Sequence, residues 1–159
     1  MDSPATQAPS RRAALTAYAT GLFADSHAEL LVIVIPLWAL YIGMSPFEIG
    51  VIVGARSVLP FFLAIHGGAL MDRLGTRRIL IALAVFCIIL PPLYPLATWF
   101  WPLLALQFCL GLANSLTWIG AQTLVCQISG ADTTMLGRFS FSARIGVMTA
   151  PIIIGVMWD

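Results

Sequence analysis

Long apolar stretches separated by short polar breaks make up the chain from residue 14 onward. Each stretch has roughly the 20 residues that an α-helix needs to cross the hydrocarbon core of a bilayer. The apolar runs are continuous and do not alternate with polar residues, so helices fit them better than the strands of a membrane barrel. The pattern predicts an all-α, polytopic membrane protein with five transmembrane helices, at residues 14–42, 47–70, 78–98, 102–127 and 136–158. Residues 1–12 predict a disordered cytoplasmic tail, which leaves 13–159 as the helical domain.

The composition supports a membrane protein and excludes two other classes. Apolar residues make up 60% of the chain and charged residues 9%, whereas soluble domains carry about 25% charged residues. The net charge is +1 and lysine does not occur, so the sequence lacks the basic run typical of nucleic-acid-binding proteins. We therefore expect the lipid bilayer as a partner and no nucleic acid.

The arginines near the ends of the predicted helices all fall on one side of the bundle. They are Arg11, Arg12, Arg73, Arg77, Arg78 and Arg138. Connections rich in arginine remain in the cytoplasm. We therefore expect a multi-pass protein of the inner (plasma) membrane, with a cytoplasmic N-terminus and with Asp159 at the outer side.

The connection between the second and third predicted helices carries the most informative motif. The small and charged residues that form it are Gly68, Asp72, Arg73, Gly75, Arg77 and Arg78. Gly68 lies one turn before Asp72, which lets a neighbouring helix approach closely, and Gly75 permits a tight turn. Asp72 can accept charge-assisted hydrogen bonds from an arginine or from the N-terminal end of a helix. Such a cluster can hold two helices together in one conformation and release them in another.

This stretch resembles the cytoplasmic loop motif G-x-x-x-D-R-x-G-R-[RK]-[RK] of the major facilitator superfamily of secondary transporters, with Thr76 in place of one arginine. The resemblance extends to residues 35–41 and 45–50. It implies alternating access through a central cavity between two six-helix halves, with a small-molecule substrate and a proton as candidate coupling ion. It also implies that the chain is a fragment of the N-terminal half, truncated after the fifth helix. We therefore expect it to need the missing C-terminal portion or another subunit to form a full cavity.

Ionisable side chains within the predicted helices are candidates for coupling, because a charge in hydrocarbon is expensive. Asp25 and Glu29 are four residues apart and share one helix face. Two carboxylates this close interact strongly and suit a proton-coupling pair. The alternative is a structural ion pair with Arg56 of the second helix. Arg56 could also bind an anionic substrate, and we favour its pairing with the carboxylates.

A polar stripe follows the fourth predicted helix at intervals of four, three, four and four residues, which places it on one helical face. Its members are Gln107, Gly111, Asn114, Trp118 and Gln122. We expect the four side chains to line the cavity as a substrate surface, or alternatively to join helices by hydrogen bonds. The stripe also resembles the family motif R-x-x-x-G, in which Gly111 fits and Gln107 replaces the arginine linked to proton transfer. Arg144 in the fifth helix, or Arg56, would then take the place of that arginine.

Small residues predict close packing between helices. Gly50 and Gly54 form a small-xxx-small pair, and the fifth helix partly resembles the pattern G-x-x-x-G-P-x-x-G-G of drug–proton antiporters, with two glycines replaced. The predicted packing residues are Gly50, Gly54, Gly111, Gly146, Pro151 and Gly155.

Together these features predict a transporter that moves a small organic solute by alternating access, in proton-linked efflux or uptake. The alternative is a non-transporting membrane receptor or assembly subunit that retains the fold. An enzyme is not expected, because neither H-E-x-x-H nor G-x-S-x-G occurs in the chain. The spacing of Cys87, Cys109 and Cys126 fits no metal site, so we expect neither a metal nor a cofactor.

Overall fold

The computed structural model describes residues 11–130 and 132–158, and all regular structure in these ranges is helical. The elements are α1 (Arg11–Tyr41), α2 (Pro46–Leu74), α3 (Thr76–Ile89), the 3-10 helix η1 (Pro91–Leu96), α4 (Phe100–Ser129) and α5 (Thr133–Trp158). Within these described ranges, five segments are long and apolar enough to span a membrane, the third of them formed by α3 together with η1. The predicted all-α, polytopic fold is therefore confirmed. Most of the predicted tail lies outside the described residues.

The turns between the first three helices follow from local sequence signals. Ser45 caps α2 in a reciprocal capping box with Glu48, whose carboxylate accepts from the Ser45 amide at 2.8 Å while the Glu48 amide donates to the Ser45 hydroxyl at 3.3 Å. Gly43, just after α1, has a φ of 82°, and Gly75, between α2 and α3, has a φ of 91°. Glycine adopts these values without the strain that a Cβ would add, so both positions allow the chain to reverse.

The third predicted helix, at residues 78–98, differs from the observed structure. The α-helix ends at Ile89, and the chain continues through Leu90 into η1. Pro91, Pro92 and Pro95 lack the amide hydrogen that an α-helix requires. The chain instead forms the shorter 3-10 pattern, with the Leu93 amide donating to the Leu90 carbonyl at 3.1 Å.

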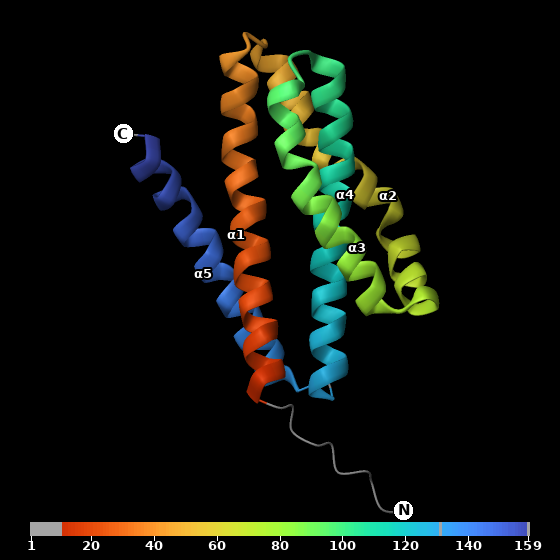
Figure 1. The fold of residues 1–159 in the computed structure, drawn as a ribbon. Coiled ribbons are helices and arrows are strands. Elements are labelled where there is room, and N and C mark those ends of the chain that lie inside the picture. Colours follow the sequence, from red (N-terminus) through yellow and green to blue (C-terminus); the bar gives the residue numbers. More distant parts are fainter. Residues whose placement is uncertain (1–10, 131, 159) are drawn as a thin grey trace, which may run out of the picture.

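The helices pack chiefly as two pairs, α1 along α5 and α2 along α4, with α3 lying on α4. Figure 1 shows α5 crossing α1, while α2, α3 and α4 form the other side of the bundle. Each pair has a glycine at its crossing. A Cβ on Gly111 of α4 would overlap the main chain of Arg56 in α2, and a Cβ on Gly146 of α5 would overlap Leu22 and Ser26 of α1. The absence of a side chain allows the backbones to approach this closely.

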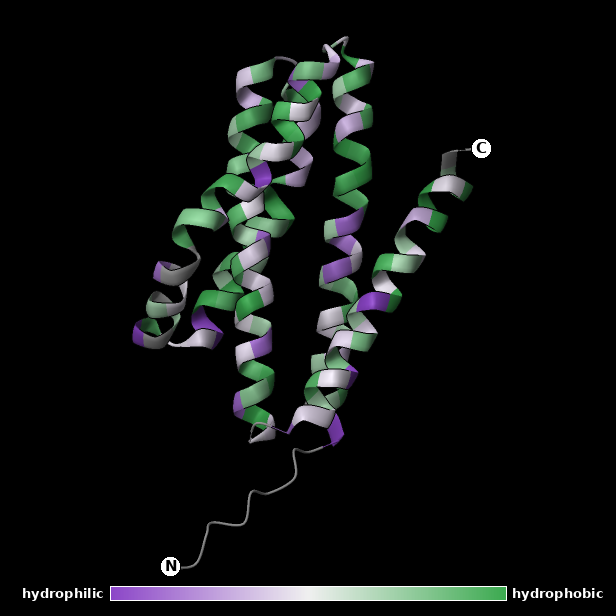
Figure 2. Cartoon of the chain, turned by 180° about the vertical axis from the view of Figure 1, so that it is seen from behind, coloured by the Kyte–Doolittle hydropathy of each residue, from purple (hydrophilic) through white to green (hydrophobic). Residues whose placement is uncertain are grey.

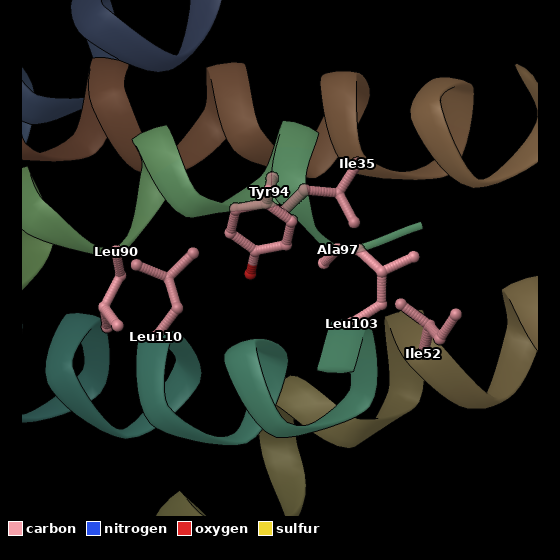
Figure 3. Close-up of a cluster of buried hydrophobic side chains, with 7 residues drawn as sticks. All are labelled: Ile35, Ile52, Leu90, Tyr94, Ala97, Leu103 and Leu110. Carbon is pink, nitrogen blue, oxygen red and sulfur yellow. The ribbon is translucent and has the colours of Figure 1, made fainter. Parts of the chain in front are cut away.

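One end of the bundle is tightly packed, and we call it the closed end. Its buried side chains come from α1, α2, the α3–η1 segment and α4, and they are Ile35, Ile52, Leu90, Tyr94, Ala97, Leu103 and Leu110 (Figure 3). The Tyr94 hydroxyl donates to the Gln107 side-chain oxygen at 3.1 Å, and the Trp38 indole donates to the Ala97 carbonyl at 3.4 Å. These contacts join η1 to both α1 and α4.

The outer surface of the bundle is largely apolar. Large side chains such as Phe47, Phe61 and Val156 are more than 70% exposed. Figure 2 shows hydrophilic segments between apolar stretches in the middle part of α1 and within α5. An exposed apolar surface of this extent suits contact with lipid, so the multi-pass membrane assignment agrees with the fold.

Candidate solute-binding cavity

A cavity of about 460 Å³ lies in the half of the bundle away from the closed end. Its walls come from α1, α3 and α4, with Phe139 contributed by α5, and we call it the four-helix cavity. Most of the lining is apolar. The polar lining residues are Thr16, Thr20, Asp25, His27, Asn114 and Thr117. A mainly apolar cavity of this size with a few polar groups is typical of small-molecule sites.

Trp118 provides the largest aromatic surface in the four-helix cavity. Its indole stacks with the ring of Phe139, with the centroids 5.4 Å apart and the planes at 27°. The guanidinium carbon of Arg144 lies 5.9 Å from the centre of the same indole, within the range of a cation–π interaction. Two residues of α5 therefore hold this α4 side chain at the cavity wall.

Asp25 brings a carboxyl group to the same cavity from α1. The charged groups that act on it electrostatically are Arg144 of α5 and Glu29, one turn further along α1. The structure thus brings together three residues that the sequence singled out separately: Asp25, Trp118 and Arg144. Asp25 and Trp118 line the cavity, whereas Arg144 is exposed beside Trp118 and is not among the described lining residues.

Arg56 lies elsewhere in the bundle. It borders a second, much smaller hollow, together with Gln107, Gly111 and Asn114 of α4 and apolar residues of α1. The ion pairing of Arg56 with the α1 carboxylates stays a prediction, and the structure gives Arg56 polar neighbours on α4.

The polar stripe on α4 is divided between different surroundings. Gln107 is 4% exposed and accepts the hydrogen bond from Tyr94. Asn114 borders both hollows, and its side-chain oxygen accepts from the Cys87 thiol at 3.3 Å. Trp118 lines the four-helix cavity, whereas Gln122 is half-buried and is not among the described residues that line it. One helical face therefore serves both contact between helices and the cavity.

The predicted packing glycines also divide into two groups, those at a helix crossing and those that meet no neighbour. Gly111 and Gly146 lie at the two helix crossings. A Cβ on Gly50, Gly54 or Gly155 would meet no atom within 4 Å in the described part of the chain. Pro151 lies inside α5.

The charged loop motif lies where α2 ends and α3 begins. Arg73, Arg77 and Arg78 are exposed around the Gly75 turn. A Cβ on Gly68 would find open space among the described atoms. The Asp72 side chain lies outside the described residues, so its role in a latch stays a prediction.

Two residues that matter for the geometry were absent from the candidates predicted by sequence. Phe139 is 1% exposed, fills the space between α1 and α4, and touches Trp118. Tyr94 is 5% exposed and joins η1 to α4. One sequence signal could have pointed to Tyr94: it stands between prolines in an apolar segment. A tyrosine buried in such a segment needs a hydrogen-bond partner for its hydroxyl.

Comparison with known proteins agrees with this geometry. The family description Major Facilitator Superfamily matches residues 15–159. A protein of Pectobacterium carotovorum subsp. carotovorum (strain PC1), MdtD, whose name provisionally assigns it to multidrug resistance, is 27% identical over 151 residues. That alignment covers 86% of this chain, and the chain spans about a third of the relative, 31% of its length. Because the family match covers nearly all of the described helices, this chain belongs to the Major Facilitator Superfamily.

Proposed function

We propose that this chain contributes its helices to a carrier that moves a small organic solute across the membrane by alternating access, and that the four-helix cavity is part of the solute site. One observation carries the proposal. In a member of a transporter family, a carboxylate and an indole from two different helices, Asp25 and Trp118, line the same mainly apolar cavity. Apolar walls would accept the body of an organic solute, and the polar groups would orient it.

Proton-linked transport is the mode that the ionisable residues favour. Asp25 and Glu29 lie on one face of α1, in the middle of an apolar span, and Arg144 supplies a positive charge beside Asp25. Intramembrane carboxylates in such surroundings often serve as proton relays. The gain of a proton on Asp25 would change its attraction to Arg144, and so would link protonation to the contact between α1 and α5.

The charged loop between α2 and α3 is proposed to act as the gate latch on the cytoplasmic side. Arg73, Arg77 and Arg78 are exposed there, and Asp72 would pair with an arginine or with a helix N-terminus in one of the two conformations. This proposal follows the resemblance of the loop to the family motif. With this arginine-rich loop on the cytoplasmic side, the N-terminus would also lie in the cytoplasm. A drug-like solute is consistent with the provisional name of the relative MdtD.

The test measures solute flux driven by a pH gradient in membrane vesicles from cells that produce the complete carrier to which this chain contributes its helices. Asp25→Asn removes the carboxylate of the four-helix cavity with little change in size. It is expected to reduce gradient-driven flux by about a hundredfold, the lower end of the typical contribution of a proton-transfer group. Asp132→Asn is the matched control: this exposed residue accepts from the Thr134 amide at 2.9 Å in the connection before α5, and asparagine also caps helices.

Equal flux in the two variants would overturn the assignment of Asp25. Binding of solutes without any flux in the complete unmodified carrier would favour the alternative, a receptor or assembly subunit that retains the fold.

A further inference from the structure

Arg56 lies in α2, within a segment apolar enough to span a membrane, and is half-buried. It lines a hollow of about 10 Å³ between α1, α2 and α4, which we call the Arg56 hollow. The helix crossing fixes this position, because the main chain of Arg56 packs directly on Gly111 of α4. A charged side chain at this depth generally pairs with another group, since a charge in hydrocarbon is expensive.

The carboxylates that could pair with Arg56 do not line the Arg56 hollow. Its described lining consists of Arg56, the amide side chains of Gln107 and Asn114, and glycine and apolar residues of α1 and α4. Asp25 lines the four-helix cavity instead, and Glu29 lines neither space. Among the described lining residues, Arg56 therefore meets polar groups and no negative charge.

The two amide side chains have donors to offer in the Arg56 hollow. The Gln107 oxygen already accepts from the Tyr94 hydroxyl at 3.1 Å, and the Asn114 oxygen already accepts from the Cys87 thiol at 3.3 Å. A carboxamide has one oxygen and one NH₂ group, so the NH₂ groups are what these side chains have left. Gln107 is 4% exposed, and its NH₂ group needs an acceptor inside the protein.

Donors around a positive charge select a small anion. A volume of about 10 Å³ has room for one water-sized species, which excludes phosphates and organic anions. A water molecule would bring two hydrogens of its own, and both side-chain oxygens at the hollow are already acceptors. A halide ion needs only donors and also compensates the charge of Arg56. The flexible Arg56 side chain can provide the small extra room that chloride needs.

We propose that the Arg56 hollow binds one halide ion, chloride in the cell, between the guanidinium of Arg56 and the NH₂ groups of Gln107 and Asn114. The ion joins α2 to α4 beside α1 and neutralises the charge that α2 carries within the membrane. Asn114 also borders the four-helix cavity, so the ion lies next to the proposed solute site. This inference goes beyond the proposed function and holds whether or not the four-helix cavity takes a solute.

Chloride binding is measured on the purified 159-residue chain in lipid nanodiscs. The readout is the broadening of the chloride nuclear magnetic resonance line, with empty nanodiscs subtracted and with bromide added to displace chloride. The variants are Arg56→Gln, Arg56→Lys and Gln107→Glu. Arg138→Gln is the matched control, since Arg138 is an exposed arginine of α5 and does not line the Arg56 hollow. Circular dichroism checks that each variant keeps its helix content.

The unmodified chain and Arg138→Gln are expected to broaden the chloride line to nearly the same extent, and bromide is expected to reverse the broadening. Arg56→Gln should weaken chloride binding by at least about tenfold, the effect of losing one hydrogen bond to a charged group, while Arg56→Lys keeps the charge and most of the binding. Unchanged binding in Arg56→Gln, or equal losses in Arg56→Gln and Arg138→Gln, would overturn the proposal. So would the absence of bromide-sensitive broadening in the unmodified chain, which would assign the hollow to a water molecule.

Gln107→Glu provides a second test that does not depend on the folding of Arg56→Gln. Its carboxylate can still accept from Tyr94, and it would supply the negative charge that the halide supplies in the unmodified chain. The midpoint of unfolding by sodium dodecyl sulfate should fall in the unmodified chain when gluconate, which is too large for the hollow, replaces chloride, because a ligand that binds only the folded state stabilises it. The midpoint of Gln107→Glu should not respond to this exchange. An equal response in the two proteins would contradict the halide site.

Discussion

At the closed end, α1, α2, α4 and η1 meet in a core of buried side chains, whereas a few turns away α1 and α4 stand apart around the four-helix cavity. Leu103 and Ile52 at the closed end have no exposed surface, while Phe23 in the cavity wall is 70% exposed. The difference arises from the side chains that α1 and α4 bring to each place, together with those that α2 and η1 add at the closed end. Leucine, isoleucine and a hydrogen-bonded tyrosine fill the closed end, and small or polar residues such as Thr20, Ala24 and Asn114 line the cavity. Close packing thus fixes one end of the bundle and leaves the other with space for a ligand.

The largest expected effect comes from the helix crossing that supports the closed end. Gly111→Val would place side-chain atoms on the main chain of Arg56, and α2 and α4 would have to move apart. We expect a loss of at least about 4 kcal/mol in the free energy of unfolding, in the range reserved for severe core disruption. Unfolding by sodium dodecyl sulfate in mixed micelles, followed by circular dichroism, measures it. Gly54→Val, on α2 and facing open space among the described atoms, is the control and should change stability little.

A matched pair of truncations compares the two regions directly. Leu103→Ala at the closed end removes a fully buried side chain and should destabilise the protein by about 3 kcal/mol. Phe23→Ala removes a larger side chain from the cavity wall and should cost less than about 0.5 kcal/mol, as for other exposed positions. The same unfolding assay applies to both. Similar losses in the two variants would show that the cavity wall is packed as tightly as the closed end.

A smaller effect is expected from the hydrogen bond that joins η1 to α4. Tyr94→Phe keeps the ring and removes the hydroxyl that donates to Gln107 at 3.1 Å. The Gln107 oxygen would be left without this donor in a buried position, at a cost of about 1 kcal/mol. Gln107→Leu combined with Tyr94→Phe removes both partners and should recover part of this loss. A double variant that is less stable than the sum of the single changes would contradict the pairing.

The sequence was sufficient to predict the number of membrane-spanning segments, because hydropathy over about 20 residues reflects a requirement of the bilayer that tertiary packing cannot override. The turn at Gly75 was predicted for a similar local reason. The end of α3 at Ile89 was not. Three prolines within five residues, Pro91, Pro92 and Pro95, remove too many amide donors for an α-helix to continue.

The candidate site was less predictable from the sequence. Helical periodicity shows which residues share one face of a helix, but it does not show which other helix packs against that face. Gln107 and Trp118 lie on one face of α4, yet Gln107 contacts η1 and Trp118 contacts α5. The proximity of Asp25 and Arg144 depends on the crossing of α1 with α5 at Gly146. Asp25 and Arg144 are more than a hundred positions apart in the sequence, so no local pattern predicts it. Phe139 carried no signal that separates it from other apolar residues of α5.

The protein's own cysteines provide the most direct test of the claim that the four-helix cavity takes the solute. Cys87 lines this cavity, whereas Cys109 is exposed on another face of the bundle, near Leu93 and Leu106. Alkylation of both thiols by N-ethylmaleimide is followed by mass spectrometry in nanodiscs, with and without tetraphenylphosphonium or tetraphenylborate at about ten times its dissociation constant. At that concentration the fraction of free sites falls to about a tenth. We predict that at least one of the two ions slows the alkylation of Cys87 by about this factor and leaves that of Cys109 unchanged. Equal rates with and without both ions at Cys87, or equal slowing at the two thiols, would contradict the account.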